Sequence, residues 1–419
     1  MPSVRSVERS FFPLDEELEL LPGSLTPYLH ESLVRLGAWM PFKFAAALLE
    51  DLQGVAVSKA KATRDTEAAG AAYVALQTEE ADELERCAPS AGPGSDKMVL
   101  SADGAMVPLV HGAWAEVKTL VIGEVEPPIW KDDAWVVHTG KLSYFSRLVT
   151  SMQFEHLTLS EVHRRGVANS RAVAALMDGA EWLQGFVDYH CPEAVRILDF
   201  PHAGQRLGQV AQALWGEASA ETQQWTHTQL HALKHQGSAD VLNTLRELQQ
   251  QHPDLDLLQE NLAYLEKRHA QMDYPAFQQQ GWPIGSGIVE SGNKLVVEAR
   301  LKGAGMHWKR ENVDPLLALR NLICSDRWAQ EWPRIEGRLR QQAAQRRQAL
   351  RQKHRQAKSP PAPLETPRPP VPTTPARPRP AGQEKTTRQP GRWRPPADHP
   401  WRRFRFGRSL YQPSNPAKN

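Results

Sequence analysis

Cysteine is scarce in this chain of 419 residues: the three present, Cys87, Cys191 and Cys324, lie far apart and form no CxxC pair. This excludes a disulfide framework and a zinc site built from cysteines. No run approaches the roughly 18 uninterrupted apolar residues of a membrane span, and the N-terminus MPSVRSVERSFFPLDEELEL is too charged for a signal peptide. We therefore expect a cytoplasmic protein without a membrane partner.

Acidic residues are nearly missing from the C-terminal part of the chain. From Arg334 onward there are 21 Lys and Arg against 4 Asp and Glu, whereas the rest holds 29 basic and 44 acidic residues. The same part contains 16 of the 33 prolines and cannot form a packed core. We expect residues 334–419 to be a disordered basic tail that contacts a polyanion, with Arg402, Arg403 and Arg405 in its aromatic-rich segment WRRFRFGRSLYQ.

The first 95 residues read as helices. SLTPYLHESLVRLGAWM and PFKFAAALLEDLQG have helical spacing, Gly54 stands where a C-cap would lie, and Ser58 is a suitable N-cap for a third helix. A helix, a short turn and a helix with basic residues near its start are typical of a helix-turn-helix DNA reader, whose candidate contacts are Lys59, Lys61 and Arg64. The alternative is a plain helical bundle that exposes a few lysines.

After the turn-rich segment APSAGPGSDK, the pattern changes from helical to extended. KMVLSADGAMVPL, AEVKTLVIGEV and DDAWVVHTG predict an antiparallel meander, and TSMQFEHLTLSEVHRRGV predicts a helix. RAVAALMDGA and AVRILDF predict two further strands, each followed by a helix. This order predicts an α+β (mixed α/β) fold with a ribonuclease H-like core over 96–216 and 281–333. The polar, Gln- and Leu-rich residues 217–280 predict a helical insertion.

Three acidic residues stand where a predicted element ends or begins. Asp103 follows the apolar run MVLSA, Asp178 closes AVAALM, and Glu290 lies in the first turns of a helix opened by GSG. Such carboxylates can converge at one edge of a mixed sheet, where a divalent cation would offset their repulsion. Oxygen ligands select Mg²⁺ or Mn²⁺, and two such ions about 4 Å apart can promote in-line attack on a phosphodiester. The alternative is that Asp103 and Asp178, each followed by Gly, are turn residues.

Two further groups of residues are candidates for this chemistry. Asp199 also ends an apolar strand and competes with Asp178, and in DFPH it has His202 three residues on, which could donate to a phosphate or to Asp199 or simply pack. In MHWKRE, aromatic and basic side chains could hold DNA phosphates and a frayed base, or form only a helix-end surface. These residues are His307, Trp308, Lys309 and Arg310.

Four segments together resemble known motifs. SADGAMVPL, VAALMDGAEWLQ, ILDFPHAGQRL and PIGSGIVESGNKLVVEARLKGAGMHW resemble, in this order, those of DDE transposases of bacterial insertion sequences of the ISKra family, relatives of the Mutator-like group. The resemblance covers roughly residues 10–330 and the patch HPWRRFRFGR. It implies a ribonuclease H-like fold, Mg²⁺ dependence, cleavage at the terminal inverted repeats of an element, and strand transfer into target DNA.

The resemblance also implies roles for residues of this sequence. Asp103, Asp178 and Glu290 would be the catalytic and metal-binding triad for two ions, and DFPH matches a C/D-x-x-H string that makes Asp199 and His202 accessory. The implied partners are double-stranded DNA, as terminal repeats and as target, and further copies of the chain in a homodimer or larger assembly. Binding to DNA would associate the protein with the nucleoid.

One departure from the family pattern leaves other functions open. Relatives often carry a cysteine-rich segment ahead of the motif that corresponds here to FFPLDEELELLP, and this chain has no CxxC pairs there. A catalytically inactive or domesticated DNA-binding protein is one alternative to a transposase. A stand-alone ribonuclease H-like nuclease, which cuts nucleic acid without transposition, is another.

Overall fold

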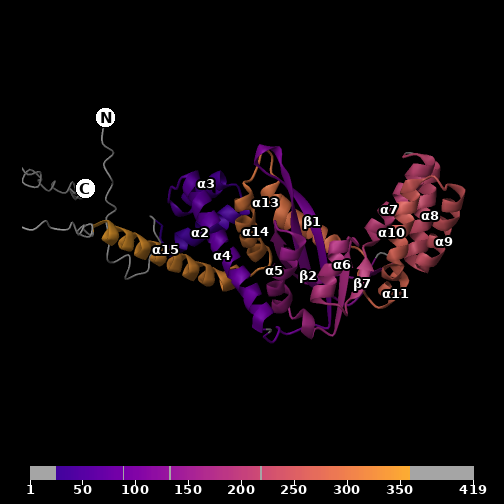
Figure 1. Cartoon of the computed structure of the whole chain (residues 1–419), viewed down its shortest axis with the longest axis horizontal. Helices are drawn as coiled ribbons and strands as arrows, with labels where there is room; N and C mark the ends of the chain where they lie inside the picture. The colour runs from indigo at the N-terminus through magenta and orange to yellow at the C-terminus, as the bar shows by residue number, and fades with distance from the viewer. Residues whose placement is uncertain (1–24, 88, 132–133, 218, 359–419) are drawn as a thin grey trace, which may run out of the picture. The chain divides into compact units, whose positions relative to one another are not determined.

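The computed structural model describes residues 25–87, 89–131, 134–217 and 219–358 (Figure 1). Its helices are α2 (Pro27–Trp39), α3 (Phe42–Gln53), α4 (Lys59–Cys87), α5 (Ser151–Arg164), α6 (Glu181–His190), α7 (Phe200–Trp215), α8 (Ala220–Gln236), α9 (Ser238–Gln251), α10 (Asp256–Lys267), α11 (Tyr274–Gln279), α12 (Gly287–Gly292), α13 (Ala299–Leu301), α14 (Arg310–Cys324) and α15 (Trp328–Lys358). A π-helical turn, η4 (Asn293–Glu298), joins α12 to α13. The strands are β1 (Lys97–Pro108), β2 (Trp114–Val125), β3 (Ile129–Lys131), β4 (Ala134–Val136), β5 (Thr139–Arg147), β6 (Ala172–Met177) and β7 (Val195–Leu198).

The centre of the fold is a mixed five-stranded sheet in the order β5-β2-β1-β6-β7. β1, β2 and β5 form an antiparallel meander, while β6 and β7 are added in parallel beside β1. Each of the two parallel connections runs through a helix, α5 and then α6, as a parallel crossover requires. The predicted α+β class and the order of meander followed by parallel strands are therefore confirmed.

The third strand of the meander differs from the expectation. The segment DDAWVVHTG was expected to supply it, but residues 134–136 form β4, which pairs only with β3 in a separate two-stranded sheet. The strand that pairs with β2 is β5, whose Tyr144 and Phe145 are buried. Burial of these aromatic side chains on the two faces of the sheet, rather than the apolar run WVV, selects the strand.

The two faces of the sheet carry different helices. One face packs against α5 and α6 through Leu100, Leu120, Phe145 and their neighbours. The opposite face of β1 and β2 packs against α12, η4, α13 and α14. The alternation of side chains along β1 explains this division, because Leu100 and Ala102 point to the α5–α6 side and Ala105 and Val107 to the other.

The N-terminal helices share their core with the C-terminal helices. Figure 1 shows α4 beside α14, and the two meet so closely that a Cβ at Gly70 would lie 2.1 Å from the carbonyl oxygen of Pro315. Helix α2 comes equally close to α4 one turn earlier, because a Cβ at Gly37 would lie 2.2 Å from Oγ1 of Thr66. The long α4 is therefore a core helix with one exposed end, and the described residues between 25 and 358 form one compact unit.

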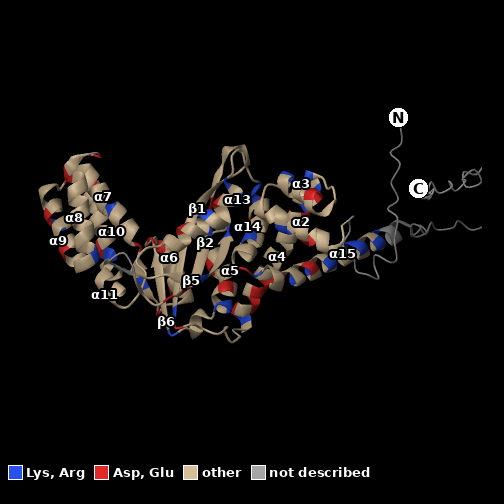
Figure 2. Cartoon of the chain, turned by 180° about the vertical axis from the view of Figure 1, so that it is seen from behind, with Lys and Arg blue, Asp and Glu red and all other residues tan. Residues whose placement is uncertain are grey.

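Helix α15 changes the expected boundary of the basic tail. Residues 334–358, which the composition predicted to be disordered, continue this helix. Its first turns are fixed because Trp332 and Ile335 are buried and Arg334 pairs with Glu331 at 2.7 Å. The basic ribbon of α15 stands out in Figure 2. Residues 359–419, with Arg402, Arg403 and Arg405, lie outside the described residues.

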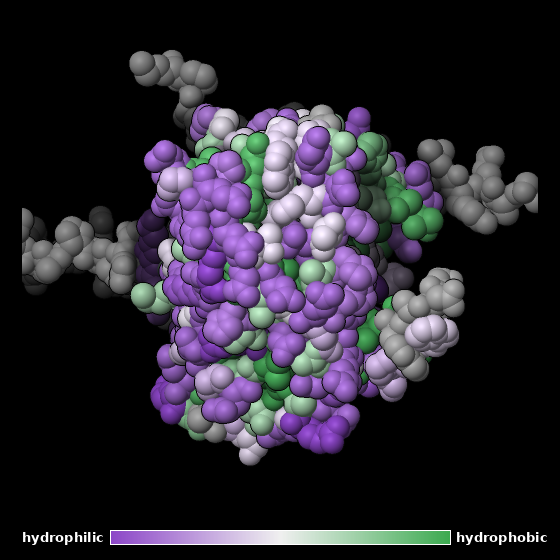
Figure 3. All heavy atoms as spheres, turned by 90° about the vertical axis from the view of Figure 1, so that its right-hand side faces the viewer, coloured by the Kyte–Doolittle hydropathy of each residue, from purple (hydrophilic) through white to green (hydrophobic). Residues whose placement is uncertain are grey.

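The predicted insertion is helical, from α8 to α11. Its apolar side chains join those of α7 and the edge of the sheet in one cluster, which includes Leu207, Leu245 and Leu262. Figure 3 shows the side of the molecule that carries α8 and α9. The surface on this side is mostly hydrophilic, with scattered apolar residues. Nowhere in the described ranges is a helix both long and apolar enough to span a bilayer.

Candidate functional site

Three aspartates stand at the same level of three neighbouring parallel strands. The register pairs Leu100 of β1 with Ala175 of β6, and Met177 of β6 with Leu198 of β7. Continued along the strands, this register aligns Asp103 with Asp178 and Asp178 with Asp199. Asp178 and Asp199 follow the ends of β6 and β7, whereas Asp103 lies within β1, which continues beyond them to Pro108. The acids at this edge are thus adjacent because of strand pairing, although they are far apart in sequence.

Asp103 is half-buried and held from two sides. Its Oδ1 accepts the backbone N–H of Gly104 at 2.7 Å, and its Oδ2 accepts Nδ2 of Asn293, from η4, at 3.1 Å. Burial raises the pKa of the Asp103 carboxyl above its usual range, and the negative charge of Asp178 raises it further, against the effect of the Gly104 bond. Two carboxylates therefore share one polar site, and a positive charge between them would be stabilised.

Asp178 sits in a turn that the insertion holds in place. Its Oδ1 accepts the N–H of Ala180 at 2.8 Å, and its backbone carbonyl accepts the hydroxyl of Tyr264 from α10. The carbonyl of the next residue, Gly179, accepts Nε of the buried Arg268 at 2.8 Å. Gly179 has a φ of +81°, where a side chain is disfavoured, and a Cβ there would lie 2.6 Å from that Nε.

Asp199 is fully buried, and protein donors occupy both of its oxygens. Oδ2 accepts Nδ1 of His202 at 2.6 Å and the His202 N–H at 3.1 Å, as the N-cap of α7. Oδ1 accepts the backbone N–H of Ser286 at 2.5 Å, which fixes the GSG segment ahead of α12. The hydrogen bond to Asp199 raises the pKa of the His202 imidazole, with further raising by the charges of Asp178 and Asp103. This is the geometry of a positioning group rather than of a ligand with free oxygens.

Glu290 makes no hydrogen bond to the aspartates among the described residues. Its side chain is exposed on α12 and makes no hydrogen bond or ion pair with any residue that the structure describes. The residue of this helix that reaches Asp103 is Asn293, one turn later. The structure therefore brings together Asp103, Asp178, Asp199 and His202, and Glu290 is exposed one helical turn before Asn293.

A small polar cavity of about 200 Å³ opens beside Asp178. Its lining includes His202 and Arg206 of α7 and Tyr264 of α10; Ala180, Gln205 and Gln209 complete it. The α7 residues lie on one face because they are spaced three or four apart. Arg206 stacks on Tyr264, with its guanidinium carbon 4.3 Å from the ring centroid. Because Asp199 holds Nδ1 of His202, the Nε2 of this ring is the nitrogen that can serve the cavity.

The residues at Asp103 fit a hard divalent cation. Asp103 and Asp178 offer carboxylate oxygens, and Oδ1 of Asn293 is buried with no hydrogen-bond partner. Oxygen donors of this kind suit Mg²⁺ or Mn²⁺. In the described ranges, no three or more His, Cys, Asp or Glu side chains are grouped so as to hold a metal ion. A site here would therefore use the two carboxylates together with an uncharged oxygen donor.

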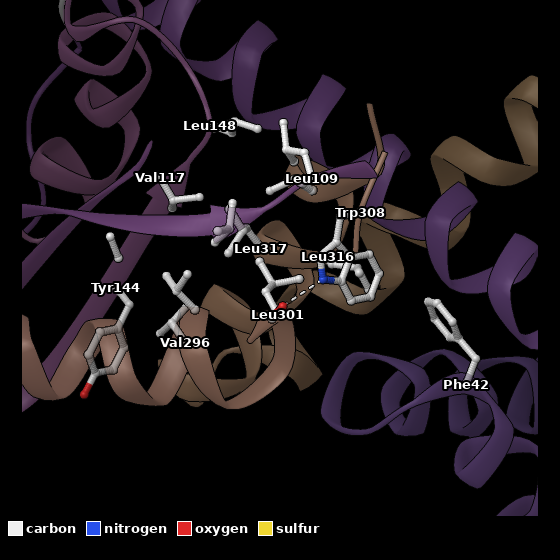
Figure 4. Packing of buried hydrophobic residues seen from close by; sticks show 14 of the residues in the cluster. Phe42, Leu109, Val117, Tyr144, Leu148, Val296, Leu301, Trp308, Leu316 and Leu317 are labelled. Carbon is white, nitrogen blue, oxygen red and sulfur yellow. Dashed lines mark hydrogen bonds between the residues drawn. The ribbon is translucent and has the colours of Figure 1, made fainter. Parts of the chain in front are cut away.

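The residues expected to contact DNA fall into two sets. Lys59, His307, Lys309 and Arg310 are exposed, and so is Arg64, whose Nε donates to the Ala60 carbonyl at 3.2 Å; Lys61 is half-buried and pairs with Asp65 at 2.8 Å. Trp308 was expected to meet a base, and this does not agree with its position in the core, where it is 9% exposed. Figure 4 shows its Nε1, which donates to the Leu301 carbonyl at 2.9 Å. Its neighbours in sequence are exposed because the strand-like bridge at Trp308 alternates sides.

Several residues of the site were missed by reading the sequence. Asn293 and Arg206 are one turn from selected residues on the same helices, so helical spacing from Glu290 and His202 could have found them. Tyr264 and Arg268 carry no such signal, because only tertiary packing brings α10 to the Asp178 turn. No protein-family model matches the chain, and no curated protein matches it.

Proposed function

We propose that this protein is a DDE-type transposase that cleaves DNA at element ends and transfers the strands into target DNA, with Mg²⁺ or Mn²⁺ bound at Asp103 and Asp178. The observation that carries the proposal is the row of Asp103, Asp178 and Asp199 in register on parallel strands. The resemblance of the motifs around these residues to those of ISKra-family transposases supports the same function.

The sheet supports a ribonuclease H-like core as the scaffold. A three-stranded antiparallel meander, followed by two parallel strands beside its first strand, is the arrangement expected of that core. Its two halves, 96–216 and 281–333, would be interrupted by the helical insertion 217–280. In this proposal the insertion has a catalytic purpose, because Tyr264 and Arg268 hold the turn that carries Asp178.

The chain's residues would divide the work as follows. Two ions held by Asp103 and Asp178, with Glu290 as the third acid of the family pattern, would supply activation of water or a 3′-hydroxyl and stabilisation of the leaving oxygen. Asp199 fixes the ring of His202. His202 and Arg206, at the cavity beside Asp178, can hold the phosphate next to the scissile bond.

The DNA would be held by charge spread over several segments. The exposed Lys59, Arg64, Lys309 and Arg310 offer contacts on the folded part, and α15 leads into the basic tail. Each phosphate neutralised by such a side chain releases counterions, so affinity should fall steeply with salt. Double-stranded DNA is the proposed partner, in a homodimer or larger assembly that brings two element ends together at the nucleoid.

The test is an assay of cleavage and joining on a labelled duplex that carries the element's own ends, with Mg²⁺. We expect Asp103→Ala and Asp178→Ala to lower the rate by about 10²–10³-fold or more while DNA binding remains. Asp199→Ala and Glu290→Ala show which of these acids is essential. Glu260→Ala, an exposed acid of α10, is the matched control and should leave the rate unchanged.

The position of Glu290 favours one rival, a DNA-binding protein without catalysis. An exposed Glu290 without a hydrogen bond to the aspartates is what an inactive descendant of a transposase would also show. If the wild-type protein binds the ends but neither cuts nor joins them, the rival holds. If it cuts without joining, a stand-alone nuclease is the better description.

A further inference from the structure

Helix α8 carries three histidines along one exposed face. His227, His231 and His235 stand four residues apart, and no other two of the 15 histidines in the chain have this spacing. All three side chains are exposed. Residues four apart lie one above the other on a helix, because about 3.6 residues make a turn. Neighbouring histidines of this set can therefore reach one common atom.

Packing on the opposite side of α8 fixes the direction of this face. Gln229 and Leu233 are buried, and each lies about 200° around the helix axis from His231. Leu233 belongs to the apolar cluster that also holds Leu207 of α7 and Leu245 of α9. Figure 1 shows α8 beside α9, which it contacts. The helix is therefore held on its buried side, and His231 points away from the core.

Two of the three rings already lie together. The ring centroids of His231 and His235 are 4.6 Å apart, with the ring planes at 45°. Two imidazoles that bind one ion at a right angle, through metal–nitrogen bonds of about 2.1 Å, have centroids about 4.6 Å apart. Right angles between neighbouring ligands suit Cu²⁺ and Ni²⁺. The pair thus has the spacing of two adjacent ligands of such an ion, so that little ordering is needed for binding.

The surroundings leave room for further ligands. His235 lines a cavity of about 1150 Å³, as do Lys234 of the same helix and Gln278 of α11. In the described part of the chain, no three or more His, Cys, Asp or Glu side chains are grouped around a possible ion, so water would complete the coordination. The positive charge of Lys234 opposes a cation here, and binding therefore depends on chelation by both rings. Imidazole nitrogens select the later transition metals, whereas Mg²⁺ prefers oxygen.

We propose that His231 and His235 form a chelating imidazole pair on the helical insertion, a site for a late first-row transition-metal ion such as Ni²⁺ or Cu²⁺. This site is separate from the one proposed at Asp103 and Asp178, because its ligands are nitrogens and not carboxylates. The inference does not rest on the proposed function. Since the two histidines lie in successive turns, a bound ion joins these turns and stabilises α8.

The test is a calorimetric titration of the full chain with Ni²⁺ at pH 7.5, with Mg²⁺ in excess to occupy oxygen sites. Metal binding requires the neutral imidazole, which a slightly alkaline pH favours. We expect His231→Ala and His235→Ala each to weaken Ni²⁺ binding by about 10–100-fold, because a single ring loses the gain from chelation. His227→Ala, which removes the third exposed histidine of the same face, is the matched control and should leave the affinity within about twofold.

Melting temperatures complete the experiment. In a chelator the three variants should melt as the wild type does, because the side chains are exposed. Added Ni²⁺ should raise the melting temperature of the wild type and leave that of His231→Ala unchanged.

The outcomes separate this inference from the proposed function. If the wild type binds no Ni²⁺ in excess Mg²⁺, or if His231→Ala or His235→Ala binds it as tightly as the wild type, the inference is wrong. Equal losses in His227→Ala and His235→Ala also overturn it, because the ion is then not held by the assigned pair. Failure of DNA cleavage with intact Ni²⁺ binding would contradict the proposed function alone.

Discussion

The strand edge at Asp103 and the side of the fold where α4 meets α14 use polar and aromatic residues in opposite ways. At the edge, Asp103 and Asp178 are half-buried and repel each other, and a cavity opens beside Asp178. At the α4–α14 side, Trp308 uses its indole N–H within the core, and Gly70 allows two helix backbones to touch. The first region therefore has polar groups that face a cavity, whereas the polar and small residues of the second region contact other parts of the core.

The difference teaches how to separate a site from a structural cluster. Residue type does not do so, because an aromatic residue flanked by basic ones suits both DNA contact and a core. What separates them is whether the polar group faces a cavity: Asp178 lines one, whereas Nε1 of Trp308 and both oxygens of Asp199 are taken by hydrogen bonds within the fold. An unpaired buried oxygen does not separate them, since Oδ1 of Asn321 on α14 lacks a partner as well. Of the three aspartates in register, Asp199 therefore belongs with the structural residues, because both of its oxygens are hydrogen-bonded within the fold.

The largest effect should come from Trp308→Ala. Removing a buried indole from the cluster with Phe42 and Leu316 should lower the free energy of unfolding by about 3–5 kcal/mol. Urea denaturation measures this loss. Lys309→Ala, next in sequence but exposed, should change stability by less than about 0.5 kcal/mol and weaken DNA binding instead. If the Trp308→Ala protein is as stable as the wild type but binds DNA more weakly, Trp308 contacts DNA and its assignment to the core is wrong.

Gly70→Ala tests the contact between α4 and α14. The new methyl group would lie 2.1 Å from the Pro315 carbonyl oxygen, a backbone atom that cannot move alone, so unfolding should become easier by about 3 kcal/mol. Gly208→Ala on α7 is the matched control, since nothing lies within 4 Å of its Cβ position. That change should stabilise the protein by about 0.5–1 kcal/mol. Equal effects would mean that α4 is not fixed against α14.

Asp199→Asn and Asp178→Asn compare the two kinds of acid at the strand ends. In a chelator at pH 7, Asp199→Asn should lower the free energy of unfolding by about 1.5–3 kcal/mol, because the charged acceptor of His202 and Ser286 is lost. Asp178→Asn keeps an acceptor for Ala180 and removes the repulsion with Asp103, so stability should not fall. A larger loss in Asp178→Asn than in Asp199→Asn would reverse the roles that we assign.

The smallest expected effect is the pH dependence that His202 contributes. Its pKa in the fold is raised above 6.5 by the bond to Asp199, so the protonated ring is favoured in the folded state. This stabilisation is fully present below pH 6.5, the unfolded value, and disappears as the pH rises through the folded pKa. Chemical denaturation in a chelator from pH 5.5 to pH 9 should show this decline in the wild type. His202→Ala should lack that step, and an unchanged profile would contradict the role of the bond.

Much of the fold could be predicted because its signals are local. The apolar runs that end in Asp178 and Asp199 gave β6 and β7, and the helices after them begin where the sequence indicated. The third meander strand was misassigned, because WVV and the β5 segment have similar propensity and only burial of Tyr144 and Phe145 chooses between them. The tail boundary was misplaced because ion pairs with α4, such as Arg338 with Glu79, hold the start of α15.

The candidate site was predictable in part. The ends of apolar runs and DFPH pointed to Asp103, Asp178, Asp199 and His202, which the structure brings together, although Asp103 lies within β1 and not at its end. The role of Asp199 could not be read from the sequence, since its second oxygen is taken by the N–H of Ser286, 87 residues away. The same limit applies to Arg268, whose partner Gly179 lies 89 residues away.

The sequence by itself determined the class of the fold, the succession of a meander and two parallel strands, and the acids that follow β6 and β7, because hydrophobic period and turn residues act over a few neighbours. Tertiary structure alone decided which of those acids keeps an oxygen free of hydrogen bonds from the protein, since the donors come from distant segments. It aligned Asp103 with Asp178, occupied Asp199 from both sides and buried Trp308. It also brought Asn293 to Asp103, because the close seat of Gly292 on β2 fixes the start of η4 against the sheet.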